Sequence, residues 1–201
     1  MNDLEQLESE FNKINSDSEK FLSLFLKNAL ASAAKIVTSK GAIYNFSPYE
    51  TEQSGFKLGK EIKNNPKSKK NVYVYHFDSA DKILFIYEYG KWENIIDKDF
   101  FFYEAGGLKR ICFTSTNDLG NISISYFKKN VATKKINWGK YGWSVFDYHY
   151  NNNILEKISV QQKEHSKSIV GTHEVIFYYE ENKLEKIVNV FPNGYEEKMF
   201  P

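Results

Sequence analysis

Two histidines in this chain lie beside carboxylates at a spacing that would suit acid–base or metal chemistry. His76 lies two residues before Asp78, and His149 lies two residues after Asp147. Side chains two residues apart on a β-strand point to the same face, so each histidine could contact its carboxylate. A catalytic site would require His76, His149 and a carboxylate to converge in a pocket. An exposed or hydrogen-bonded strand histidine is the simpler interpretation, and we expect no catalytic residue and no metal site.

Other signatures of catalysis or cofactor binding are missing from the sequence. It contains no phosphate-binding glycine loop, no Gly-x-Ser-x-Gly turn and no His-Glu-x-x-His pair. The single cysteine, Cys112, falls in a run typical of a strand, which favours a small buried side chain over a nucleophile. One cysteine also excludes an internal disulfide and fits a reducing compartment. We therefore expect a protein that is not an enzyme and that uses no cofactor.

The residues best suited to recognition lie at 137–143, Asn-Trp-Gly-Lys-Tyr-Gly-Trp. Trp138, Tyr141 and Trp143 offer large rigid contact area of the kind that carries binding energy at interfaces, and the glycines between them would allow a turn that presents them. The tryptophans could instead pack inward and close a sheet corner. A second candidate is a set of hairpin carboxylates that could oppose a basic partner, namely Glu104, Glu156, Glu180, Glu181 and Glu185.

These carboxylates belong to a pattern that recurs along the chain. Residues 103–111, 150–158 and 179–187 each run from an aromatic residue through a polar or glycine-containing connector to Leu, two further residues and Ile. A looser copy covers 77–86. The pattern predicts consecutive β-hairpins. Leu and Ile three residues apart would face opposite sides of a strand, so either the Leu sits in the turn, or a bulge resets the alternation, or both faces are buried.

The residues before the hairpins have a different pattern. Residues 3–38 predict two helices, the second so apolar that we expect it to be buried on more than one side. Residues 41–48 could include a short strand, and a lysine-rich run between Lys57 and Lys70 is most simply a solvated loop. No aromatic residue lies between Phe56 and Tyr73, which argues against nucleic-acid binding through this run.

Together these patterns predict an α+β protein in which N-terminal helices pack on a large antiparallel β-meander sheet of about eight to ten strands built from repeated hairpins. We expect one compact domain with a helical segment at 1–40, a connector with a basic loop at 41–71 and the hairpin-repeat sheet at 72–201. The net charge of +1 gives no general attraction to nucleic acid or acidic membranes. With no readable signal peptide or membrane span, the expected location is cytoplasmic.

The frame of aromatic residue, polar connector and Leu-x-x-Ile resembles the hairpin units of Rhs/YD-repeat proteins over roughly two-thirds of the chain. The Tyr-Asp pair of those units is Tyr-Glu at 103 and 179, Tyr-Asn at 150 and Phe-Asp at 77. A helical start followed by a hairpin-rich sheet is similar to immunity proteins that neutralise bacterial polymorphic or contact-dependent toxins. The resemblance implies a non-catalytic inhibitor whose partner is a toxin domain. The alternative is a module that binds a glycan or a small apolar molecule on exposed Tyr and Trp.

Overall fold

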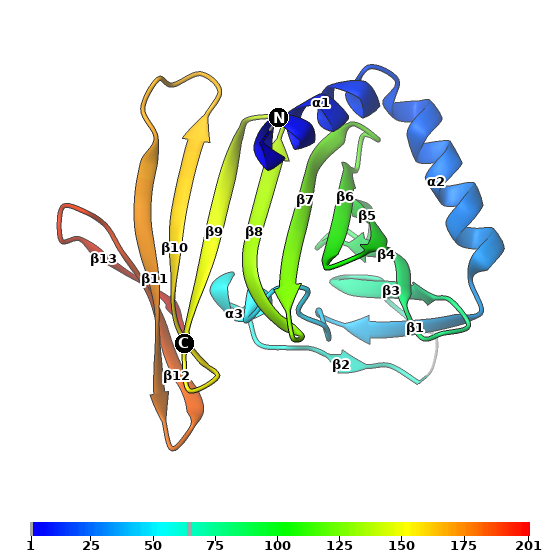
Figure 1. The fold of residues 1–201 in the computed structure, drawn as a ribbon. Coiled ribbons are helices and arrows are strands. Elements are labelled where there is room, and N and C mark those ends of the chain that lie inside the picture. Colours follow the sequence, from blue (N-terminus) through cyan, green and yellow to red (C-terminus); the bar gives the residue numbers. More distant parts are fainter. Residues whose placement is uncertain (1, 64–65) are drawn as a thin grey trace. The chain divides into compact units, whose positions relative to one another are not determined.

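The computed structural model describes residues 2–63 and 66–201, which form three helices and a 13-stranded antiparallel sheet (Figure 1). The helices are α1 (Asp3–Asn15), α2 (Ser18–Ser32) and α3 (Glu50–Gln53). The strands are β1 (Lys35–Lys40), β2 (Lys60–Glu61), β3 (Val72–Phe77), β4 (Ile83–Tyr89), β5 (Ile95–Glu104), β6 (Gly107–Thr114), β7 (Leu119–Lys128), β8 (Val131–Gly139), β9 (Gly142–Asn151), β10 (Ile154–Glu164), β11 (Gly171–Glu180), β12 (Lys183–Val190) and β13 (Glu196–Phe200).

The sheet is a meander. Its order is β13-β12-β11-β10-β9-β8-β7-β6-β5-β4-β3-β1-β2, so from β3 onward each strand lies beside its neighbours in sequence. The predicted α+β class and hairpin meander are confirmed, with more strands than expected. Two residues of the predicted basic connector, 64 and 65, lie outside the described residues.

The chain divides into two compact units, which are described separately. The N-terminal unit contains Met1–Ile43, Gly59–Ser123 and Trp138–Lys140. The C-terminal unit contains Tyr44–Leu58, Ile124–Asn137 and Tyr141–Pro201. The boundary falls within β7 and within β8, and the segment expected as a single connector at 41–71 contributes to both units.

The second predicted helix ends earlier than expected. α2 stops at Ser32, and residues 35–40 form β1, which pairs with β3 along its whole length. Three consecutive β-branched residues, Ile36, Val37 and Thr38, favour this extended conformation. The short strand expected within 41–48 does not form.

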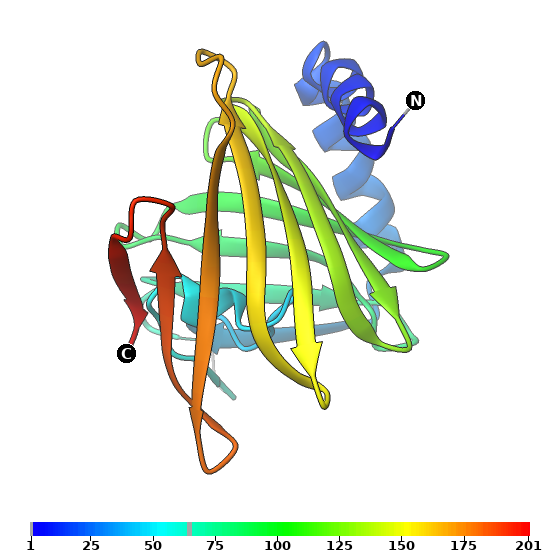
Figure 2. The same ribbon diagram turned by 60° about the vertical axis from the view of Figure 1, so that its left-hand side comes forward.

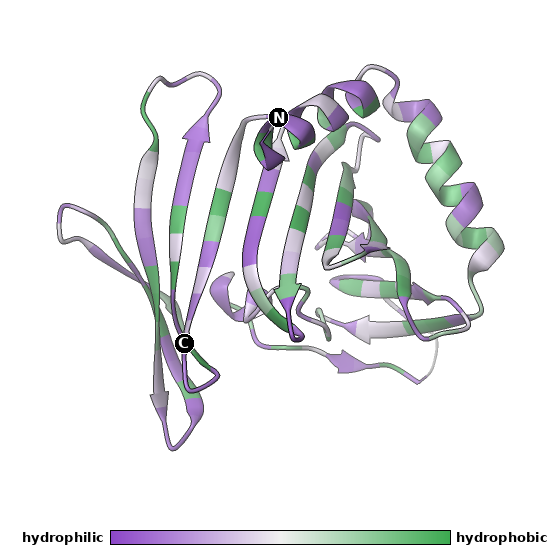
Figure 3. Ribbon diagram, in the orientation of Figure 1, coloured by the Kyte–Doolittle hydropathy of each residue, from purple (hydrophilic) through white to green (hydrophobic). Residues whose placement is uncertain are grey.

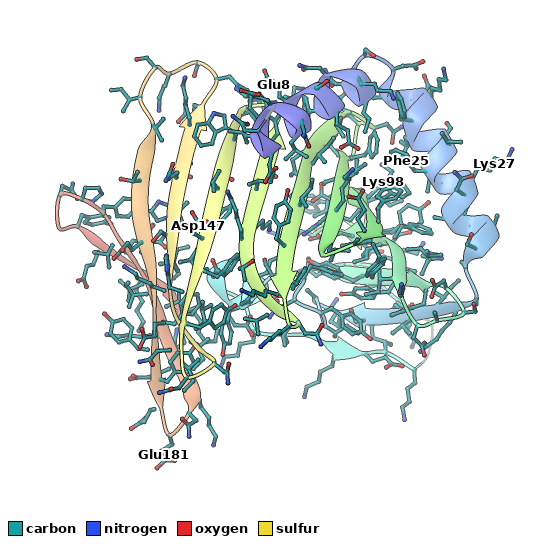
Figure 4. All side chains as sticks on the ribbon, in the orientation of Figure 1. Glu8, Phe25, Lys27, Lys98, Asp147 and Glu181 are labelled. Atoms are coloured by element: carbon teal, nitrogen blue, oxygen red, sulfur yellow. The ribbon has the colours of Figure 1, made fainter. Side chains whose placement is uncertain are left out.

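The expectation that α2 is buried on more than one side is wrong. Leu22 is its only buried residue, whereas Leu24 and Leu30 are exposed. Figure 3 shows that apolar residues extend over much of the surface of α2. Its contact with the sheet is narrow and aromatic. Phe25 packs on Phe100 and Phe102 with ring centroids 5.7 and 5.3 Å apart, and Figure 4 shows Lys27 pointing the opposite way.

An aromatic ladder crosses the sheet of the N-terminal unit beneath Phe25. His76 of β3 stacks on Phe85 of β4 at 3.9 Å, and Phe85 stacks on Phe100 of β5 at 5.8 Å. Phe100 meets Phe113 of β6 edge to face at 6.0 Å. The strand register brings these positions opposite or next to one another on one face. This ladder forms the centre of the core of the N-terminal unit.

The hairpins of the C-terminal unit follow the predicted frame. In the turn after β9, Asn152 and Asn153 have φ of 49° and 64°, and after β11 Glu181 and Asn182 have 48° and 62°. Two successive residues at positive φ define the turn whose twist matches paired strands, and asparagine tolerates that conformation. Figure 2 shows both turns at one end of these strands and the β10–β11 connection at the other.

The structure also settles why Leu and Ile of the frame lie three residues apart. The register of β9 with β10 shifts between Leu155 and Lys157. The register of β11 with β12 shifts in the same way between Leu184 and Lys186. A bulge therefore resets the alternation, so Leu155 and Ile158 both enter the core of the C-terminal unit. In the copy at 103–111 the register is continuous, and its Leu and Ile face opposite sides.

Candidate functional site

A groove at the end of the C-terminal unit contains two of the three predicted aromatic anchors. We call it the tryptophan groove. It has a volume of about 600 Å³ and is lined by Asn137 of β8, by residues 141–144 at the start of β9, and by Gln162, Lys163, Glu164, Lys167, Ile169 and Gly171. Tyr141 and Ile169 are 78% and 79% exposed, and Trp143 is half-buried. Large exposed apolar side chains beside a cavity are typical of an interaction site.

Local packing fixes the shape of the tryptophan groove. Gly142 pairs with Glu164, and a Cβ atom at Gly142 would lie only 2.2 Å from the carbonyl oxygen of Lys163. Glycine is therefore required for β9 to approach β10 this closely. The amide of His165 donates to the carbonyl of Tyr141 at 2.9 Å, and Lys167 pairs with Glu164 at 2.6 Å. These contacts hold the β10–β11 connection beside the aromatic residues.

Trp138 stands apart from this arrangement. It is half-buried near the end of β8, belongs to the N-terminal unit, and does not line the tryptophan groove. The chain turns at Lys140 and Tyr141, between Gly139 at the end of β8 and Gly142 at the start of β9, and leaves Tyr141 exposed and Trp143 half-buried.

The predicted carboxylates are divided between the two units. Glu104 lies in the N-terminal unit and forms an ion pair with Lys109 at 3.0 Å. The other four are exposed in the C-terminal unit at or near the β9–β10 and β11–β12 turns, and Figure 4 shows Glu181 at a tip: Glu156, Glu180, Glu181 and Glu185. Glu156 and Glu185 are the extra residues of the two bulges, so each interrupts the pairing of its strand.

The histidines do not form the pairs that their spacing allowed. Asp78 accepts hydrogen bonds from the backbone amides of Ala80 and Lys82, and so shapes the β3–β4 turn. His76 is buried in the aromatic ladder, where Nδ1 has no hydrogen-bond partner among the described residues, and burial lowers the pKa of His76. His149 lies in the other unit, 2.9 Å from the hydroxyl of Ser159. Nowhere in the described residues do three or more His, Cys, Asp or Glu side chains gather as metal ligands would.

Cys112 is buried, as its position in a strand predicted. Burial raises the pKa of the thiol, with the charge of Asp99 adding to the effect. A neutral buried thiol is a poor nucleophile.

Carboxylates gather on the face of the N-terminal sheet opposite the aromatic ladder. Asp99 is 2% exposed and accepts two hydrogen bonds from Arg110, Nε to Oδ1 at 2.9 Å and Nη2 to Oδ2 at 2.7 Å. Glu88 lies directly across from Asp97 and accepts a 2.6 Å bond from the hydroxyl of Tyr73. Burial, together with the neighbouring carboxylates, raises the pKa of both Glu88 and Asp97. This is a charge network within the sheet.

The raised pKa of Asp97 predicts how the stability of the protein depends on pH. Since burial and the charge of Asp99 raise it in the folded state, the folded protein binds this proton more tightly than the unfolded chain. The Asp97 carboxylate should therefore destabilise the fold above its folded pKa and cost nothing below its unfolded pKa of about 3.9. We expect Asp97→Asn to unfold at a higher temperature than wild type at pH 7 and at nearly the same temperature at pH 3. An exposed control, Asp81→Asn, should not show this pattern. Lower stability of Asp97→Asn at pH 7 would contradict the assignment.

A second groove in the C-terminal unit was not predicted. We call it the tyrosine groove. Its volume is about 580 Å³, and it is lined by three tyrosines, Tyr49, Tyr150 and Tyr179, with Asn45, Pro48, Glu52, Leu58, Asn153, Ile154, Leu155 and Asn182. Tyr150 and Tyr179 are the aromatic residues of two repeat copies, so the repeat pattern contained part of the signal. The segment at 45–58 that completes the groove has no such pattern, and its place could not be read from the sequence.

Comparisons with known proteins assign the chain to no family. No protein-family model matches it, and a search of curated proteins finds no significant sequence match. In the described part of the chain, no helix has both the length and the apolar character needed to cross a membrane.

Proposed function

We propose that this protein is a non-catalytic inhibitor that binds a protein partner through the tryptophan groove, and that the partner is a toxin domain of the kind neutralised by bacterial immunity proteins. The observation that carries the proposal is that Tyr141 and Ile169, both largely exposed, line one groove together with the half-buried Trp143. Aromatic and aliphatic side chains around a cavity supply anchors that a flat polar surface lacks. The class of partner comes from the resemblance of the hairpin frame and helical start.

The two predicted recognition features of the C-terminal unit lie at opposite ends of its strands. β10 has 11 residues, which at a rise of about 3.3 Å per residue separates its ends by roughly 35 Å. The tryptophan groove lies at one end, and Glu156, Glu180, Glu181 and Glu185 lie toward the other (Figure 2). We assign the groove the short-range contacts and the carboxylates a long-range attraction to a basic partner, because exposed charges act mainly on association rates.

Loss of either groove aromatic residue should weaken inhibition. The chain is co-expressed with the product of the gene immediately upstream, and copurification and growth rescue are measured. We expect Trp143→Ala and Tyr141→Ala each to weaken the complex by about tenfold or more, because truncating an interface anchor commonly costs more than 1 kcal/mol.

Trp92→Ala is the matched control, since Trp92 is 81% exposed and belongs to the N-terminal unit. It should bind and rescue as wild type does. The proposal fails if wild type neither copurifies with the upstream product nor rescues growth. An equal loss in the Trp92 and Trp143 variants would instead refute the assignment to the groove.

A further inference from the structure

The tyrosine groove is held in shape by its own hydrogen bonds. Tyr179 donates its hydroxyl to the carbonyl of Leu155 at 2.9 Å, and its ring lies beside that of Tyr49 with centroids 6.3 Å apart. The Tyr49 ring also packs on Phe177 of the core, with centroids 5.4 Å apart. The rings that line the groove are therefore positioned before any ligand arrives, which reduces the entropy lost on binding.

The segment across from the hairpin turns is equally fixed. Asn45 accepts a hydrogen bond from the amide of Thr51 at 2.9 Å and donates to Glu52 at 2.8 Å. Tyr49 has a φ of 54°, a left-handed conformation that is rare for a residue with a large side chain. Strained backbone of this kind persists where the surrounding contacts determine it, and it clusters at ligand sites. Here it accompanies the placement of the Tyr49 ring in the groove.

Three asparagine amides and one carboxylate line the groove beside the tyrosines. Asn153 and Asn182 line it from the two hairpin turns, and neither side chain forms a hydrogen bond within the described part of the chain. An amide offers both a donor and an acceptor, the combination that matches a hydroxyl group. Glu52 is the one charged side chain among the described lining residues, and Asn45 already binds it. The described lining thus offers no cation to an anionic ligand.

The groove continues past Tyr150. An adjoining cavity of about 330 Å³ shares Asn45, Pro48, Tyr150 and Asn153 with it and extends toward Phe127. Tyr150 and Asn153 therefore lie where two cavities meet, and a ligand of several units could contact both.

We propose that the tyrosine groove binds a neutral oligosaccharide. The apolar faces of sugar rings would stack on Tyr150 and Tyr179, and the sugar hydroxyls would exchange hydrogen bonds with Asn153 and Asn182. This site is separate from the tryptophan groove and does not depend on the protein partner proposed above.

The test is an NMR titration of the full-length ¹⁵N-labelled protein with three probes up to millimolar concentration. The probes are the N-acetylglucosamine hexamer, cellohexaose and maltohexaose. We expect at least one hexamer to shift amide resonances at 45–49, 150–155 and 179–182. Asn153→Gly/Asn182→Gly keeps both positive-φ turns while removing the two amides, and it should weaken binding by about tenfold. Tyr150→Leu, which removes the stacking ring but retains an apolar side chain, should do the same.

Tyr178→Leu and Trp143→Ala are the controls and should bind the hexamer as wild type does. Tyr178 neighbours Tyr179 in sequence but pairs with Lys186 on the other face of the strand. The proposal is overturned if none of the hexamers shifts these resonances, or if the glycine and leucine variants bind unchanged. A neutral peptide that shifts the same residues when no hexamer does would equally overturn the sugar assignment.

Discussion

Phe100→Ala should lower the free energy of unfolding by about 3–5 kcal/mol, the range for truncating a buried phenylalanine. Phe100 is 1% exposed and touches the rings of Phe25, Phe85 and Phe113, so its removal leaves a cavity bounded on three sides by aromatic residues. Because rings fixed in a sheet collapse poorly into such a cavity, we expect the upper part of this range. Domains of this size commonly have only about 5–15 kcal/mol of stability, so a large fraction would be lost.

Equilibrium urea unfolding followed by circular dichroism measures the change. Phe56→Ala serves as the control, because Phe56 is 68% exposed and a surface substitution usually changes stability by less than about 0.5 kcal/mol. Phe100→Leu should fall between the two. If Phe100→Ala were within about 1 kcal/mol of wild type, the aromatic ladder could not be the centre of this core.

Arg110→Met should destabilise the protein by about 3 kcal/mol or more at pH 7, because it leaves the buried carboxylate of Asp99 without its cation. Asp99 is 2% exposed and its two oxygens both accept from Arg110, whose side chain remains partly exposed. Asp97 and Glu88 nearby carry the same charge, so no other described group replaces the lost cation at Asp99.

Two further variants separate the buried charge from the loss of a side chain. Arg110→Met/Asp99→Asn should recover most of the stability, since a neutral amide no longer needs the cation. Lys35→Met removes an exposed ion pair with Asp81 of similar length, 2.9 Å, and should cost less than about 1 kcal/mol. Thermal unfolding at pH 7 measures all three. Equal effects of Arg110→Met and Lys35→Met would show that burial of Asp99 does not decide the outcome.

The hairpins were predictable because their determinants are local. Alternating side chains and turn residues such as Asn152 and Asn153 specify each hairpin within a short span, and the repeat made the pattern visible several times over. Even the bulges were visible in the sequence, as the three-residue spacing of Leu155 and Ile158. What the spacing could not show was which of three causes produced it, since that depends on the partner strand.

The predictions were wrong or incomplete where contacts between residues far apart in the sequence determine the structure. β1 forms because β3 offers it a complete set of backbone partners, which outweighs the helical pattern continuing from α2. Tyr49 is placed beside Tyr150 and Tyr179 by contacts across the chain, so no local pattern marked the tyrosine groove. Tyr141 and Trp143 were identified by residue type alone. Ile169, which completes their groove, lies in the connection between β10 and β11.

The meander also bears on how the protein is made. Strands β3 to β13 each pair with the strand just before or just after in the chain, so most closures span short loops. Contact order is therefore low for so large a sheet, and folding should be fast relative to sheets with distant pairings. During synthesis each new hairpin can add to the edge left by the previous one as it leaves the ribosome, which limits the time that an unpaired strand is open to aggregation.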